Sequence, residues 1–103
     1  MCFFITPTIL AASDVERKIE ELKQTIRINP DDADAHANLG AAYEIAGKSY
    51  KAIKSYKRAI RINPDNAEAH FNLGLAYGEL GRYEEAIESY KQAIKIDPDK
   101  NIY

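Results

Sequence analysis

The stretch Ala67–Pro98, AEAHFNLGLAYGELGRYEEAIESYKQAIKIDP, decides the fold of this chain because it repeats an earlier stretch. Moved back by 34 positions it falls on Ala33–Pro64, ADAHANLGAAYEIAGKSYKAIKSYKRAIRINP, and more than half of the aligned residues are identical. Pro30 precedes Pro64 by the same interval that separates Pro64 from Pro98. A period of roughly 34 residues is typical of repeats built from a pair of helices.

Each copy of the repeat has apolar residues at helical spacing, so each copy predicts two helices. In the first copy, Leu39 and Tyr43 form the stripe of one helix, and Ile53 and Tyr56 form the stripe of the next. Gly40 removes side-chain bulk from the first helix, which allows the two helices of a pair to approach closely. The expected helices are 33–46, 49–62, 67–80 and 83–96.

The residues between these segments predict where the helices begin and end. Gly47 and Gly81 stand where the first helix of each pair must stop, as a left-handed cap requires. Pro64 ends the second helix because proline disfavours helical geometry in the residue before it. Asp65 and Asn66 then offer side-chain oxygens that could cap the next helix.

The repeated residues resemble the motif of the tetratricopeptide repeat family. They are His36, Leu39, Gly40, Tyr43, Ala52, Tyr56 and Pro64 in the first copy, and His70, Leu73, Gly74, Tyr77, Ala86, Tyr90 and Pro98 in the second. Histidine replaces the usual tryptophan. The resemblance covers two full repeats over Ala33–Lys100. It implies an all-α fold, a right-handed α-solenoid of antiparallel helix pairs, with about five helices when a preceding half-repeat helix is included.

The chain outside the two copies divides into three further parts. Residues 14–29 predict a capping or half-repeat helix with Ile19, Leu22 and Ile26 on its apolar face, and Ser13 or Asp14 could cap it. Residues 1–13 are apolar and contain Pro7, so we expect a poorly ordered end or a strap over exposed helix surface. The repeats take residues 33–66 and 67–100, and residues 101–103 form a tail.

Composition limits the classes of function. At 103 residues the chain is one domain, and its net charge of −2 gives no reason to expect nucleic acid as a partner. Cys2 is the single cysteine, so no internal disulfide can form, and we expect a reducing, cytoplasmic setting. No stretch approaches the roughly 20 apolar residues that a membrane span needs.

The sequence contains none of the common catalytic or metal-binding motifs, so we expect no enzyme activity, no cofactor and no metal site. His36 and His70 occupy equivalent positions, which favours a packing role for both. The tyrosines that recur with the repeat are expected in the core; they are Tyr43, Tyr56, Tyr77 and Tyr90.

The resemblance implies a protein-binding function, because the first helices of successive pairs line a concave groove in this family. The groove would hold an extended peptide or a partner helix. Carried onto this sequence, the groove residues are Asp34, Ala37, Asn38, Ala41, Glu44, Ile45, Glu68, Phe71, Asn72, Leu75, Gly78 and Glu79. Asp34 and Glu68 would repel a terminal carboxylate, so the groove better suits an apolar or basic peptide.

Two alternatives remain open at this stage. The first is a self-assembling scaffold, a dimer or a domain-swapped oligomer, because both ends of the solenoid lack a polar capping helix. The second is an anionic partner on the helix 49–62, which carries basic residues and no acid. Its cations are Lys51, Lys54, Lys57, Arg58 and Arg61.

Overall fold

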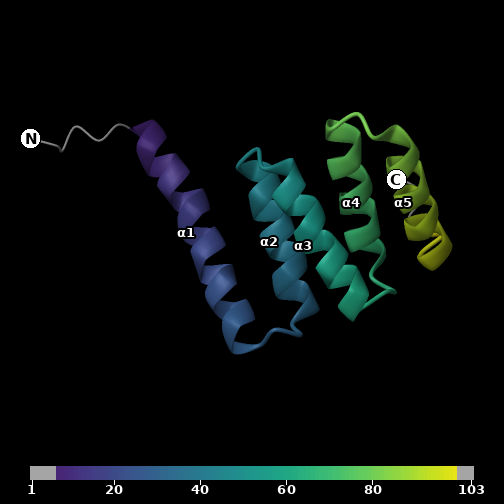
Figure 1. Cartoon of the computed structure of the whole chain (residues 1–103), viewed down its shortest axis with the longest axis horizontal. Helices are drawn as coiled ribbons and strands as arrows, with labels where there is room; N and C mark the ends of the chain where they lie inside the picture. The colour runs from purple at the N-terminus through teal and green to yellow at the C-terminus, as the bar shows by residue number, and fades with distance from the viewer. Residues whose placement is uncertain (1–6, 100–103) are drawn as a thin grey trace, which may run out of the picture.

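The computed structural model describes residues 7–99, with side chains from Asp14 onward, and this part of the chain contains five helices. They are α1 (Pro7–Ile28), α2 (Ala33–Ile45), α3 (Ser49–Ile62), α4 (Ala67–Glu79) and α5 (Tyr83–Ile96). Figure 1 shows them side by side in chain order. The predicted all-α fold of consecutive antiparallel pairs is confirmed, and the four repeat helices match their expected bounds to within one residue.

Packing follows the order of the chain. The largest contacts join α2 to α3 and α4 to α5, while α3 against α4 and α1 against α2 connect the pairs. Tyr56 is fully buried between helices, and a methyl group added at Gly40 would lie 2.7 Å from its ring. The missing side chain of Gly40 therefore makes room for the tyrosine that anchors the first pair.

Side-chain caps begin the first helix of each pair. Asp32 precedes α2, and its Oδ1 accepts a hydrogen bond of 3.0 Å from the amide of Ala35. Asn66 precedes α4 and accepts a bond of the same length from the amide of Ala69. Each cap satisfies one amide that has no partner within the helix. Of the two residues predicted to cap α4, Asn66 is the N-cap and Asp65 is not.

A glycine ends the first helix of each pair, as expected. Gly47 has φ of 78° and Gly81 has φ of 77°, a left-handed conformation that glycine adopts without steric cost. Beyond Gly47, the amide of Lys48 donates to the carbonyl oxygen of Tyr43 at 2.8 Å. This pairing satisfies a carbonyl at the helix end and reverses the chain toward α3.

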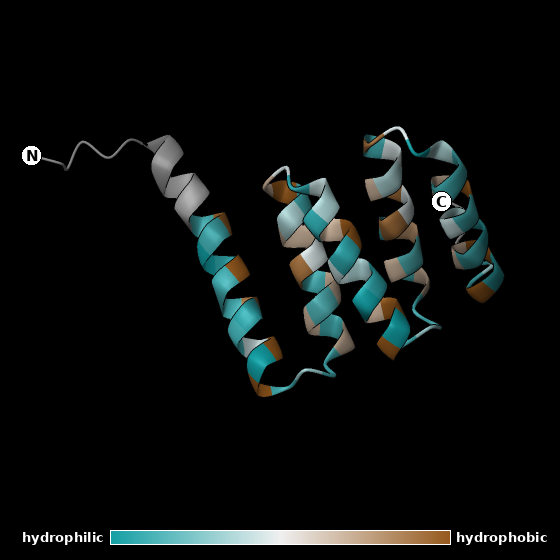
Figure 2. Ribbon diagram, in the orientation of Figure 1, coloured by the Kyte–Doolittle hydropathy of each residue, from teal (hydrophilic) through white to brown (hydrophobic). Residues whose placement is uncertain are grey.

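Helix α1 is longer than the sequence predicted. It begins at Pro7 and not at Asp14, because proline is tolerated in the first turn of a helix, where its missing N–H has no helical partner. Ile19 and Leu22 are buried, and Figure 2 shows most of the hydrophobic bands in the coloured part of α1 on the side turned toward α2. Residues 1–6 lie outside the described part of the chain, so the strap stays a prediction. The division of the chain into repeats also stays a prediction.

None of the helices within residues 7–99 combines the length and the apolar character that crossing a bilayer requires.

Candidate functional site

The predicted groove residues all lie on α2 and α4, which contact each other directly, and we call this surface the α2–α4 face. None of these residues is buried. The exposed ones are Asp34, Asn38, Ile45, Glu68, Leu75 and Glu79. The half-buried ones are Ala37, Ala41, Glu44, Phe71, Asn72 and Gly78.

Two carboxylates from different helices meet at one end of the α2–α4 face. The Tyr56 hydroxyl donates to Glu44 Oε1 at 2.6 Å, and the Ser49 hydroxyl donates to Glu79 Oε1 at 3.2 Å. Burial raises the pKa of Glu44 above its ordinary value of 4.5, the bond from Tyr56 opposes that rise, and the nearby Glu79 adds to it. A cationic group placed here would therefore relieve the repulsion between two acids.

Burial and the bond to Glu44 also raise the pKa of the Tyr56 phenol, so its proton stays on the oxygen. A protonated hydroxyl can only point its hydrogen at one acceptor, and here that acceptor is the carboxylate. Tyr56 thus joins the core of the first pair to the acidic end of the face.

Apolar surface adjoins the acids on α4. The Phe71 ring lies 5.5 Å from the Tyr90 ring, centroid to centroid, at an interplanar angle of 43°. Leu75 is 41 % exposed, and nothing lies within 4 Å of a methyl group added at Gly78. The face therefore offers room and apolar contact beside two acidic groups.

The two histidines bind backbone. His36 Nε2 donates to the carbonyl oxygen of Pro30 at 2.9 Å, and His70 Nε2 donates to that of Pro64 at 3.0 Å. Each ring thus ties a helix to the loop that leads into it. Within the part of the chain that the structure describes, no group of His, Cys, Asp and Glu is arranged to hold a metal ion.

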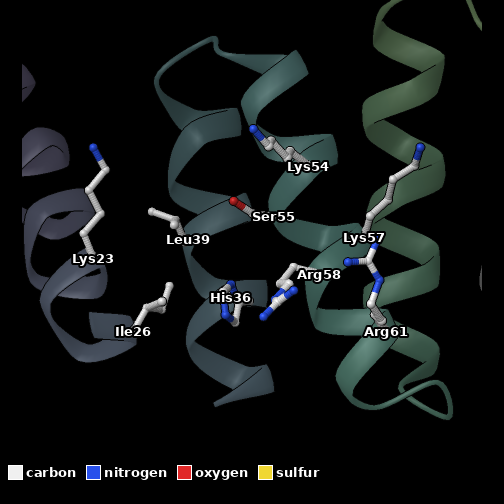
Figure 3. A pocket seen from close by; sticks show the side chains of 9 residues that line it. All are labelled: Lys23, Ile26, His36, Leu39, Lys54, Ser55, Lys57, Arg58 and Arg61. Carbon is white, nitrogen blue, oxygen red and sulfur yellow. The ribbon is translucent and has the colours of Figure 1, made fainter. Parts of the chain in front are cut away.

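A second feature, which the sequence did not predict, is a pocket of about 440 Å³ between α1 and α3, with α2 behind it (Figure 3). We call it the α1–α3 hollow. Its apolar surface comes from Ile26 on α1 and Leu39 on α2. The cations that line it are Lys23, Lys54, Lys57, Arg58 and Arg61.

The hollow faces away from the α2–α4 face. With 3.6 residues per turn, His36 and Leu39 lie on the side of α2 opposite to Asp34 and Ala41. The charge run on residues 49–62 was visible in the sequence. Lys23 and Ile26 carried no such signal, because only the packing of α1 on α2 brings them opposite α3.

The outer side of α5 carries apolar residues that α3 buries at the equivalent positions. Ile53 on α3 is 6 % exposed because α4 packs over it, whereas its counterpart Ile87 on α5 is 53 % exposed. Ile94 is 44 % exposed, and its counterpart Ile60 is half-buried against the core. Within the described residues no helix packs over this side of α5.

Family profiles match most of the chain. A profile described as Tetratricopeptide repeat matches residues 67–100, and one described as TPR repeat matches residues 15–47 and 45–81. Among curated proteins, none matches this sequence.

Solved structures share the fold. A crystal structure of MamA is 32 % identical to this chain in sequence and superposes with a TM-score of 0.81. The match covers 91 % of this chain and 55 % of the MamA chain. A second crystal structure, of the MamA protein, is also 32 % identical and has a TM-score of 0.78. That match covers 91 % of this chain and 51 % of the MamA chain. The chain thus spans about half the length of the MamA chains.

The second TPR of Spaghetti (RPAP3), bound to the HSP90 peptide SRMEEVD, is 24 % identical and has a TM-score of 0.79. The match covers 87 % of this chain and 83 % of that one. At this level of identity the likeness concerns the fold alone.

Proposed function

The chain belongs to the tetratricopeptide repeat family, whose members are typically protein-binding modules, and we propose that this one binds an extended peptide or partner helix without catalysis. The binding surface in this proposal is the α2–α4 face. The segment it suits carries basic side chains beside apolar ones.

The observation that carries the proposal is the convergence of Glu44 and Glu79 beside apolar surface. A lysine or arginine of the partner would lie between the two acids and form charge-assisted hydrogen bonds with them. An apolar side chain two or three residues away would cover Leu75 and the edge of Phe71.

The acids on this face also disfavour one kind of ligand. The RPAP3 structure contains a peptide with three carboxylate side chains, SRMEEVD. On this chain Asp34, Glu68 and Glu79 are exposed on the α2–α4 face, so an acidic peptide would meet like charge there. Asn38 and Asn72 lie between the acids, where their amides can bond the backbone of a basic peptide.

The first test reverses one charge of the acidic pair. Glu79→Lys should weaken binding of a fluorescein-labelled peptide of alternating leucine and lysine by about tenfold, because it replaces an attraction by a repulsion. Fluorescence anisotropy in low and physiological salt measures the affinity, and the difference should shrink as salt rises.

Glu84→Lys is the matched control, since it makes the same charge change at an exposed position on α5. It should leave the affinity close to that of the wild type. Equal weakening by Glu79→Lys and Glu84→Lys would show that net charge alone governs binding and would remove the α2–α4 face from the proposal.

A second candidate function is self-association, which the uncovered isoleucines of α5 favour. Ile87 and Ile94 are exposed in the register where α3 buries Ile53 and Ile60 under α4. In a repeat array a neighbouring repeat buries such a face, and a second copy of the chain could do the same.

Light scattering over a concentration series measures this association. The wild type should gain molar mass as its concentration rises, and the double change Ile87→Glu with Ile94→Glu should keep it monomeric, because buried charge in an interface is costly. Lys91→Glu adds negative charge at another exposed position of α5 and should still associate. A wild type that stays monomeric throughout contradicts this candidate.

A further inference from the structure

We propose that the α1–α3 hollow is a second docking site, which takes an acidic segment of a partner protein with one large apolar side chain at its centre. This site lies on the other side of α2 from the α2–α4 face and does not depend on the function proposed for that face. Three features support this site: the way the helices form the hollow, cations on its rim that make no ion pair with the described residues, and a second hollow of the same repeat with different charges.

The hollow arises from the way the helices pack. Helix α1 and helix α3 both lie against α2 but do not contact each other, so a gap opens between them over α2. Leu39 and His36 of α2 are buried beneath that gap, and half-buried Ile26 of α1 flanks it. At about 440 Å³, the space can hold a large aliphatic or aromatic side chain together with its neighbouring backbone.

The rim of the hollow carries an excess of positive charge, because among its cations only Lys23 has a carboxylate within ion-pair distance in the described part of the chain. Lys54, Arg58 and Arg61 are exposed on α3, and none of them makes an ion pair or a hydrogen bond with the described residues. Lys23 on α1 forms an ion pair with Glu20 at 3.7 Å, and both side chains are exposed to solvent, which weakens the pair. Figure 3 shows these cations among the side chains that line the hollow.

The repeat supplies a second hollow with a different charge. Between α3 and α5, over α4, a pocket of about 470 Å³ is lined by Ile60, His70, Leu73 and Ser89, each 34 positions after a residue that lines the α1–α3 hollow. Lys54 and Arg58 are replaced there by Glu88 and Gln92. The shape of the hollow is therefore a property of the repeat. Lys57 and Arg61 line both hollows, and the first differs in carrying Lys54 and Arg58 where the second has Glu88 and Gln92.

The chemistry of the site favours an acidic polypeptide over nucleic acid. Nucleic-acid sites combine basic groups with aromatic rings on which bases stack, and no tyrosine or phenylalanine lines this hollow. Its apolar surface is aliphatic, from Ile26 and Leu39, which suits a leucine or a similar side chain. Carboxylates on both sides of that side chain would meet Lys23 on one wall and Lys54, Arg58 and Arg61 on the other.

The test exchanges the charges of the two hollows. The double variant Lys54→Glu with Arg58→Gln gives the first hollow the residues that the second already carries at equivalent positions, so the fold tolerates them. The reciprocal variant Glu88→Lys with Gln92→Arg leaves the first hollow intact. The probe is a fluorescein-labelled peptide with glutamates on both sides of a central leucine, and a second peptide has glycine in place of that leucine.

The wild type should bind the leucine peptide, and the first variant should bind it about tenfold more weakly or worse, since two favourable charges are lost and one repulsive charge is gained. The glycine peptide should bind the wild type several-fold more weakly, because it leaves the aliphatic surface uncovered. The reciprocal variant should keep the original site and gain a second one.

Three outcomes would overturn the inference. They are no binding of the leucine peptide to the wild type, equal affinity of both charge variants for that peptide, and equal affinity of the wild type for the leucine and glycine peptides. Binding of phosphatidylserine vesicles or of inorganic phosphate in place of the peptide would also overturn it and would assign the cations to a lipid surface or to a simple anion. Glu79→Lys, on the opposite side of α2, should leave this binding unchanged, so failure here is distinguishable from failure of the groove proposal.

Discussion

Replacing Tyr56 by alanine is expected to lower the free energy of unfolding by about 3–5 kcal/mol, the typical cost of truncating a buried aromatic residue. Tyr56 is the largest fully buried side chain in the described part of the chain. Its ring fills the space that Gly40 leaves open, and its hydroxyl donates the 2.6 Å bond to Glu44. Alanine would leave a cavity between α2 and α3 and remove the hydrogen bond to a half-buried carboxylate.

Tyr90 is the matched control for this change because it occupies the equivalent position of the second repeat and also lies on a glycine, Gly74. It is only half-buried, so Tyr90→Ala should cost less. Urea denaturation followed by circular dichroism measures both. An equal decrease in the free energy of unfolding for both variants would show that the deeper burial of Tyr56 does not make it more important for stability than Tyr90.

Replacing Gly40 by alanine is the second large effect, and its sign is opposite to what helix propensity predicts. Alanine is more favourable than glycine inside a helix by about 1 kcal/mol. At Gly40, however, the added methyl group would lie 2.7–2.9 Å from three carbons of the Tyr56 ring, and that ring is fully buried. Overpacking of a closed core costs about 1–3 kcal/mol, so we expect a net loss of stability.

Gly78→Ala tests the same substitution where nothing lies within 4 Å of the added methyl group. Both glycines lie within helices, Gly40 near the middle of α2 and Gly78 in the last turn of α4, so alanine gains propensity at both and gains less at Gly78. We expect Gly78→Ala to raise the midpoint of urea denaturation and Gly40→Ala to lower it. A rise at both positions would contradict the account of the close contact between Gly40 and Tyr56.

Helix positions were the most predictable part of this structure, because the signals that set them are local. Proline, glycine and capping residues act within a few positions of where they stand, and the left-handed Gly47 and the cap at Asn66 appeared where the sequence placed them. The predicted start of α1, at residue 14, was wrong because the local signal there was misinterpreted. Pro7 was interpreted as an interruption, although a proline in a first turn begins a helix as readily as it ends one.

The candidate site was predictable only as a set of positions on two helices. The repeat register placed Glu44 and Glu79 on first helices, but their approach to each other depends on the packing of α2 against α4. The hydroxyl of Tyr56 was expected only as part of a core residue. The hydroxyl bonds to Glu44 because the Tyr56 ring, which belongs to α3, packs against Gly40 of α2 and places its oxygen next to the Glu44 carboxylate.

By itself, the sequence determined the period, the four repeat helices, the glycines and the Asn66 cap that bound them, and the family, since each depends on residues close together in the chain. Tertiary packing alone decided which side chains from separate helices meet. Lys23 and Ile26 became part of a basic hollow because α1 and α3 both lie against α2 without contacting each other. Identical isoleucines became core at position 53 and surface at position 87 because a following helix covers α3 and no described helix covers α5.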